Sequence, residues 1–167
     1  MARSSPSPSP TRNGPKPSIF KGRYLSQLDF AVNCLRSNID LANETVAFLK
    51  PLGGGWFDFL RRRLEREGLA YEEITRNRDW PQNATNIVLS TMHSAKGLEF
   101  DHVIILGLSD EVTPHGTEAD DDQLSTLRRL LAMAVARARK TVIIGFKEDE
   151  ASSLVSYFEE GSFDEYE

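Results

Sequence analysis

Hydrophobic residues recur with helical spacing in three stretches of the 167-residue chain. In each stretch apolar side chains return every three or four positions, which places them on one face of an amphipathic helix. The second stretch begins at Trp56 and stops at Gly68, a residue type that commonly ends helices, and the third predicted helix covers residues 123–139. The three apolar stripes consist of Leu25, Leu28, Val32, Leu35 and Ile39; Phe57, Leu60 and Leu64; and Leu124, Leu127, Leu131 and Val135.

Short runs rich in β-branched and aromatic residues lie between these stretches and predict strands. Strand, helix and strand alternate, and such βαβ units favour a parallel sheet with right-handed crossovers. The predicted fold is therefore α/β, with a parallel sheet of about five strands flanked by helices. The five runs cover residues 45–49, 70–75, 86–91, 101–108 and 140–146.

Two segments of different composition enclose this pattern. Residues 1–23 are rich in Ser and Pro and contain basic side chains but no acid, so we expect a disordered leader there. Residues 148–167 hold eight acids and no base, which makes them an acidic tail. Residues 24–147 remain as one domain, long enough to bury a substantial core.

Composition narrows the classes of function. No stretch approaches the roughly 20 apolar residues that cross a bilayer, and the N-terminus lacks the apolar core of a secretory signal. We therefore expect a soluble cytoplasmic protein with no membrane partner. Cys34 is the only cysteine, which excludes an intrachain disulfide and fits a small core residue better than a nucleophile. The net charge of −5 argues weakly against wrapping by nucleic acid, but the middle of the chain is nearly neutral, so charge does not decide the ligand.

Two features raise the question of phosphate or metal binding. The glycines at 53–55 lie between a predicted strand and helix, where phosphates often bind. A nucleotide P-loop, however, requires G-x-x-x-x-G-K-[ST], and Trp56 and Phe57 follow here instead. We therefore interpret the glycines as a flexible turn, with a phosphate contact as the alternative. The consecutive acids at 120–122 cannot all face one ion and fit the first turn of a helix, so no metal site is expected.

The segment TMHSAKGLEF, residues 91–100, places a polar cluster between two predicted buried strands. Together with those strands it resembles the fifth motif of the UvrD/Rep-type superfamily 1 DNA helicases, which is a strand, then T-x-H-x-A-K-G-L-E-F, then a second strand. The later stretch LRRLLAMAVARAR resembles the sixth motif of the same family. Residues 45–74 are similar in pattern to the start of the second RecA-like domain in these helicases. The resemblance covers residues 45–146 and implies a RecA-like fold.

The resemblance also implies contacts with single-stranded DNA. Thr91 and His93 match positions that contact phosphates and sugars of the strand in the family. Hydroxyl and imidazole groups can hold a nucleic-acid backbone without reading its sequence. Lys96 completes the predicted DNA contacts, although it could support the nucleotide or simply face solvent.

A second set of positions matches the nucleotide site of the family. Glu99 matches a glutamate that binds the ribose, and Gly97 permits the tight turn beside it. Arg137 matches the arginine finger that reaches the γ-phosphate of ATP, which makes it the predicted catalytic residue. Without the resemblance, Arg137 and Arg139 would be interpreted as the charged end of a helix, and Arg139 keeps that interpretation here. Arg128 and Arg129 are given no functional role, with pairing of one of them to the acidic loop as the alternative.

The chain also departs from the family pattern. Ala132 and Ala136 replace the tyrosine and threonine of the sixth motif, and Ser125 and Thr126 replace acids before its paired arginines. The first RecA-like domain, which carries the phosphate-binding loop and the Mg²⁺-holding acids, has no counterpart in this sequence. ATP and Mg²⁺ are therefore expected only in a complete two-domain enzyme.

We interpret the chain as the second RecA-like domain of an ATP-dependent DNA helicase, present as a fragment or as a separately encoded half. Its expected partners are single-stranded DNA and a first RecA-like domain, and alone it should not hydrolyse ATP. One alternative is a degenerate helicase-like module that binds DNA or protein as a regulator. Another is an independent nucleotide-binding enzyme, which only the glycines at 53–55 favour.

Overall fold

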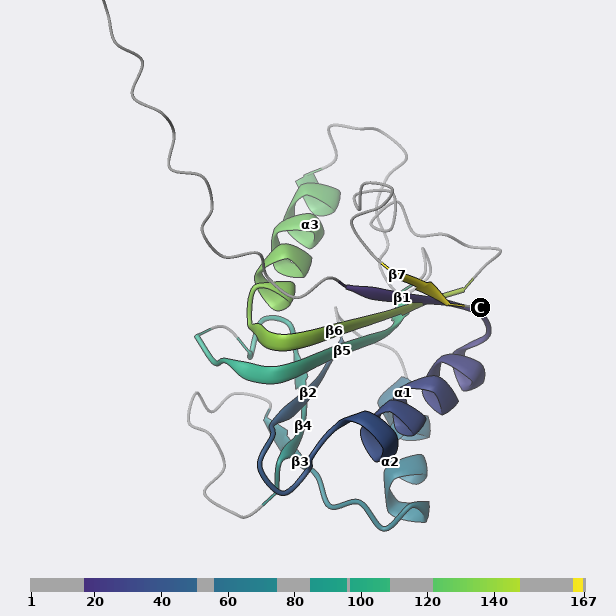
Figure 1. The fold of residues 1–167 in the computed structure, drawn as a ribbon. Coiled ribbons are helices and arrows are strands. Elements are labelled where there is room, and N and C mark those ends of the chain that lie inside the picture. Colours follow the sequence, from purple (N-terminus) through teal and green to yellow (C-terminus); the bar gives the residue numbers. More distant parts are fainter. Residues whose placement is uncertain are drawn as a thin grey trace, which may run out of the picture.

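The computed structural model describes residues 17–50, 56–74, 85–95, 97–108, 122–147 and 164–166. Strands and helices alternate along most of this range, as the sequence predicted, and Figure 1 shows their arrangement. The helices are α1 (Tyr24–Asn38), α2 (Trp56–Arg66) and α3 (Asp122–Val135). The strands are β1 (Ser18–Lys21), β2 (Val46–Lys50), β3 (Glu72–Ile74), β4 (Ile87–Thr91), β5 (Phe100–Leu108), β6 (Ala138–Phe146) and β7 (Asp164–Tyr166).

The strands form one sheet in the order β3-β4-β2-β5-β6-β1-β7, and every pair is parallel. All five predicted strands are present, which confirms the α/β class. Two further strands enlarge the sheet beyond the predicted number. β1 pairs with β6, and β7 then pairs with β1, so segments near both ends of the sequence extend one edge.

This extension corrects the prediction for part of the leader. Ser18–Lys21 is not disordered, because Ile19 and Phe20 are buried and the strand pairs with residues 143–146 of β6. Within the tail, Asp164–Tyr166 forms β7. Residues 1–16, 51–55, 75–84 and 148–163 lie outside the described residues.

Helices cover both faces of the sheet. α1 and α2 lie together on one face, and α3 lies on the other (Figure 1). Leu28, Leu35 and Leu60 pack into the core under α1 and α2. The opposite core contains Leu131 and Ala134 of α3. Strand residues alternate between these two cores, because successive side chains of a strand point to opposite faces. The sheet is thus buried on both sides, as expected for a parallel sheet.

Two details of α1 differ from the predicted stripe. Leu25 is 61% exposed and lies in the first turn of α1. Gln27, a polar residue, is buried instead. Its Nε2 donates to the carbonyl of Gly22 at 2.8 Å, and its Oε1 accepts from the N–H of Gly107 at 2.9 Å. These bonds make its burial acceptable.

Candidate nucleotide and nucleic-acid site

The polar segment that follows β4 begins with an ordered turn. Thr91 ends the strand, and its Oγ1 accepts from the backbone N–H of Ser94 at 3.0 Å and bonds the Ser94 hydroxyl at 2.9 Å. The N–H of Ala95 donates to the carbonyl of Thr91 at 3.1 Å. Met92 and Ala95 are buried in the core beneath α3. Two apolar anchors therefore hold the turn and leave its polar residues at the surface.

His93 lies between these anchors and is exposed. Thr91 is half-buried, and its hydroxyl is already engaged with Ser94. Both residues lie at the carboxyl end of β4, and their contact with DNA stays a prediction. Lys96 lies outside the described residues.

Lys50, which the sequence analysis did not single out, lies beside this turn. It ends β2 and is paired in register with Thr91, so the two side chains project from the same face of the sheet. Its carbonyl accepts from the N–H of Met92 at 3.0 Å, and its Nζ lies 4.6 Å from the centre of the Phe57 ring. From the sequence alone Lys50 is only a lysine at the end of a predicted strand, because its neighbour Thr91 depends on the strand order.

Gly97 has a φ of +89°, a conformation that side chains rarely adopt. A Cβ at this position would meet nothing within 4 Å, so backbone conformation rather than space explains the glycine. Leu98 then donates its N–H to the carbonyl of Ala95 and packs against the buried cluster. The predicted tight turn at Gly97 is confirmed.

The segment from Thr91 to Phe100 runs back along the sheet. It starts at the carboxyl end of β4 and ends at the amino end of β5, and β2 lies between these strands. From the Lys50–Thr91 pair, four residues along β2 reach the Val46–His102 pair, and two along β5 reach Phe100. At about 3.3 Å per residue the two ends are about 20 Å apart. The predicted DNA and nucleotide positions therefore lie at opposite ends of the sheet.

Glu99 lies at the amino end of β5 and meets a residue from the sixth-motif segment. Its Oε2 accepts from Nε of Arg139 at 3.2 Å and from Nη2 at 3.1 Å. Both side chains are more than half exposed. Arg139 does not end a helix, as the sequence suggested, because it belongs to β6.

Arg137 lies in a two-residue turn between α3 and β6, so the predicted helix ends four residues early. Its N–H donates to the carbonyl of Ala134 at 3.1 Å, and its carbonyl accepts from the N–H of Phe100 at 2.9 Å. This last bond joins the fifth-motif and sixth-motif segments. Within the described part of the chain, the buried Nε–H of Arg137 has no hydrogen-bond partner. An uncompensated donor of this kind fits an anionic ligand.

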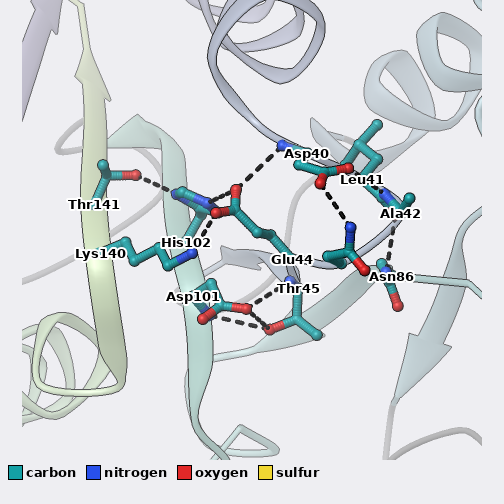
Figure 2. Close-up of polar contacts among 11 residues, drawn as sticks. Asp40, Leu41, Ala42, Glu44, Thr45, Asn86, Asp101, His102, Lys140 and Thr141 are labelled. Carbon is teal, nitrogen blue, oxygen red and sulfur yellow. Dashed lines mark hydrogen bonds and ion pairs between the residues drawn. The ribbon is translucent and has the colours of Figure 1, made fainter.

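A polar network that the sequence did not predict lies close to these residues (Figure 2). His102 is buried, with Nε2 2.9 Å from Oε2 of Glu44 and Nδ1 2.6 Å from Oγ1 of Thr141. Since a carboxylate has no proton to give, Nε2 donates to Glu44. Lys140 also bonds Glu44. Hydrogen bonds from Lys140 and His102 lower the pKa of Glu44 to about 2. The network joins the amino ends of β2, β5 and β6.

The described residues also bear on other kinds of site. No three His, Cys, Asp or Glu side chains gather there in a group that could hold a metal ion. No described helix is long and apolar enough to span a bilayer. Gly53–Gly55 and Asp120–Asp121 fall outside the described ranges.

Solved structures with the same architecture define the fold. The C-terminal domain of a possible DNA helicase from Lactobacillus plantarum WCFS1 superposes with a TM-score of 0.67 at 21% identity, over 92% of this chain and 87% of that one. The Escherichia coli DEAD-box protein SrmB gives a TM-score of 0.54 at 14% identity, over 93% and 92%. The fold is that of a RecA-like helicase domain.

Sequence comparison then identifies the family. Residues 41–149 match the UvrD-like helicase C-terminal domain, and the chain belongs to this family. The ATP-dependent DNA helicase Rep of Buchnera aphidicola is 33% identical over 87 residues, which are 52% of this chain and 12% of that helicase. PcrA of Staphylococcus aureus is 36% identical over 69 residues, 40% of this chain and 10% of PcrA. The chain thus spans about a tenth of the length of these relatives.

Proposed function

We propose that this chain supplies one wall of the ATP site and part of the single-stranded DNA path in an ATP-dependent DNA helicase of the cytoplasm. The other wall, with the phosphate-binding loop and the acids that hold Mg²⁺, would come from a first RecA-like domain in the same or another chain. The observation that carries the proposal is the bond between the carbonyl of Arg137 and the N–H of Phe100. It joins the backbone of Arg137, whose buried Nε–H has no partner among the described residues, to the residue that follows Glu99.

Arg137 and Glu99 would bind different parts of the nucleotide at this end of the sheet. Bound ATP would supply a phosphoryl group whose negative charge spreads over its oxygens as it is transferred. Arg137 has a donor that needs an acceptor, so it would bind and stabilise that charge. Glu99 accepts hydrogen bonds only and would receive them from the ribose hydroxyls. The acids that hold Mg²⁺ would belong to the first RecA-like domain.

Thr91, His93 and Lys50 would contact DNA at the other end. Lys50 places a positive charge in register with Thr91, and His93 is exposed beside it. A cation with hydroxyl and imidazole donors suits the phosphates and sugars of a single strand. Lys96 follows in the same segment. Since Met92, Ala95 and Leu98 anchor the connecting segment in the core, movement at one end would be transmitted to the other.

A measurement of ATP hydrolysis tests whether the ATP site needs both this chain and a first RecA-like domain. The purified chain with single-stranded DNA should show no turnover above the buffer background. Addition of a first RecA-like domain from the same organism should restore turnover, and Arg137→Ala in this chain should abolish it. Turnover by the chain alone that Arg137→Ala removes would contradict the proposal.

Binding of labelled single-stranded DNA at two salt concentrations tests the proposed DNA contacts of Thr91, His93 and Lys50. We expect affinity to fall as salt rises, because phosphate contacts release counterions. Lys50→Ala should weaken binding and reduce the slope of log affinity against log salt by about 1. The matched control is Arg66→Ala, which removes an exposed charge from the far end of α2. No binding of the wild-type chain even at low salt would refute the DNA role.

A non-catalytic regulator is the second candidate. The observation in its favour is that Ala132 and Ala136, which stand where the family pattern has tyrosine and threonine, are both exposed. That surface offers no ring or hydroxyl to a nucleotide. The two candidates are separated by the reconstitution experiment, since a regulator would bind DNA or a protein but would not restore turnover with any first domain.

A further inference from the structure

Glu99 is held by Arg139 through one oxygen only. Oε2 of Glu99 accepts two hydrogen bonds from the Arg139 guanidinium, at 3.2 Å from Nε and 3.1 Å from Nη2. Oε1 of Glu99 receives no hydrogen bond from the described residues. A carboxylate oxygen can accept two hydrogen bonds, so one oxygen is saturated and the other is available.

The backbone fixes both partners. Glu99 immediately precedes Phe100, and Arg139 immediately follows Ala138, with Phe100 and Ala138 paired between β5 and β6. The Phe100 N–H bond to the Arg137 carbonyl closes the same end of the ladder. The Glu99–Arg139 contact therefore spans one rung of the sheet, and the planar guanidinium holds the carboxylate with two donors in a defined orientation.

Stability does not explain this contact. The side chains of Glu99 and Arg139 are 58% and 60% exposed, and exposed ion pairs contribute little, since water and salt screen them and two long side chains lose freedom. What the contact does provide is orientation of an acceptor that would otherwise rotate freely in solvent.

We propose that Arg139 is a positioning residue that presents Oε1 of Glu99 to the ribose hydroxyls of a bound nucleotide. This inference rests on the proposed function, because it assumes that Glu99 receives the ribose. Arg139 itself touches neither sugar nor phosphate. The pair therefore sets how strongly the site distinguishes a nucleotide with ribose hydroxyls from one without them.

Nucleotide titrations of the isotopically labelled chain in the presence of a first RecA-like domain, followed by NMR, test the inference. The probes are ATP and 2′,3′-dideoxy-ATP, which differ only in the two hydroxyls. A hydrogen bond to a charged group at a solvent-exposed site should favour ATP about three- to tenfold. Arg139→Ala should remove most of this preference, and Arg139→Lys, which keeps the charge but not the fork, should retain only part of it. Arg66→Ala, which removes an exposed charge from the end of α2, is the control and should keep the full preference.

The Glu99→Gln variant separates the two ways in which the inference could fail. If the preference for ATP disappears in Glu99→Gln but survives in Arg139→Ala, the role of Arg139 is refuted and the ribose role of Glu99 stands. If the wild-type chain shows no preference, both are refuted. Preference lost equally in the two single variants, with no further loss in the double variant, supports the inference, because residues that act as a unit are not additive. Melting curves of each variant check that all remain folded.

Discussion

The buried side-chain donor of Arg137 is removed from water without gaining a hydrogen bond from the described residues. Its Nε–H is buried without a partner in the described part of the chain, and such a donor typically destabilises a protein by about 1–3 kcal/mol. Its backbone is nevertheless well bonded, through Ala134 and Phe100. A residue whose backbone is fixed but which keeps a buried side-chain donor without a partner is typical of a site that is completed by a ligand.

Substitution of Arg137 should therefore separate stability from activity. Arg137→Met keeps most of the apolar stem and removes the unpartnered donor, so the free energy of unfolding should stay the same or rise by about 1 kcal/mol. ATP turnover of the reconstituted enzyme should fall about 10³-fold or more. Urea unfolding and a steady-state ATPase assay measure the two effects. A loss of more than about 2 kcal/mol of stability would mean that Arg137 has a structural role.

The sequence motifs pointed to individual candidate site residues but not to the contacts between them. Thr91, His93 and Glu99 were found because they lie within ten matched positions. Arg139 was not assigned to Glu99, since the two are 40 residues apart and no local pattern connects them. Lys50 was missed for the same reason, because its register with Thr91 follows from the strand order.

Among the elements, α1 is locked to the sheet by a buried glutamine. Gln27 bridges the Gly22 carbonyl and the Gly107 N–H. Gly107 has a φ of +72° and lies where the register between β5 and β6 shifts. A Cβ on Gly145 of β6 would lie 2.4 Å from Oε1 of Gln27. Because Gly145 has no side chain, there is room for the Gln27 amide. Its oxygen accepts the hydrogen bond of the Gly107 N–H, where the pairing of β5 and β6 is irregular.

Gly145→Ala should destabilise the fold by about 2–4 kcal/mol, because Gln27 must move and break buried hydrogen bonds. Gln27→Ala alone should also destabilise, since it leaves the Gly107 N–H unpaired. The double variant should lose less than the sum of the two, as expected for residues that share one contact. Chemical denaturation of the four proteins gives the coupling free energy. Strict additivity would show that the clash is relieved in another way.

Sequence periodicity predicted the elements better than their ends. Alanine and arginine favour helices, so the sequence predicts a third helix that continues to residue 139. In the structure this helix ends at Val135. Pairing of Ala138 with Phe100 explains the difference, because strand hydrogen bonds override a weak local preference. β1 was missed since four residues after a Pro-rich segment give too short a pattern.

For the whole molecule, the network around Glu44 joins separate parts of the chain. Glu44 precedes β2, His102 belongs to β5, and Lys140 belongs to β6. Asp40, just after α1, donates its backbone N–H to the same carboxylate at 3.1 Å. One ionised group therefore fixes the amino ends of three strands and the end of a helix, as Figure 2 shows.

Acid should loosen this arrangement. The bonds to Lys140 and His102 lower the pKa of Glu44 from the ordinary 4.5 to about 2. A depressed folded-state pKa means that the contribution is complete above pH 4.5 and is lost as the pH falls toward 2. Glu44→Gln should therefore flatten the dependence of unfolding free energy on pH in this window. Lys140→Met removes the larger cause and should flatten it in part. An unchanged slope in Glu44→Gln would contradict the assignment.

The strand order was the part of the fold that the sequence could not supply. β4 and β5 are consecutive in the chain, but β2 lies between them. Local patterns predict strands one at a time, whereas their order depends on which faces and edges become buried together. That order is what separates the two ends of the fifth-motif segment.

The two edges of the sheet have a consequence for association between copies of the chain. Each edge is a three-residue strand, β3 or β7, and each contains two adjacent acids, Glu72 and Glu73 or Asp164 and Glu165. Short, charged edge strands discourage pairing with another sheet, a common route to aggregation. Removal of β7 would uncover β1, whose Ile19 and Phe20 are apolar. The segment of the acidic tail that forms β7 therefore covers an apolar strand that would otherwise be the edge of the sheet.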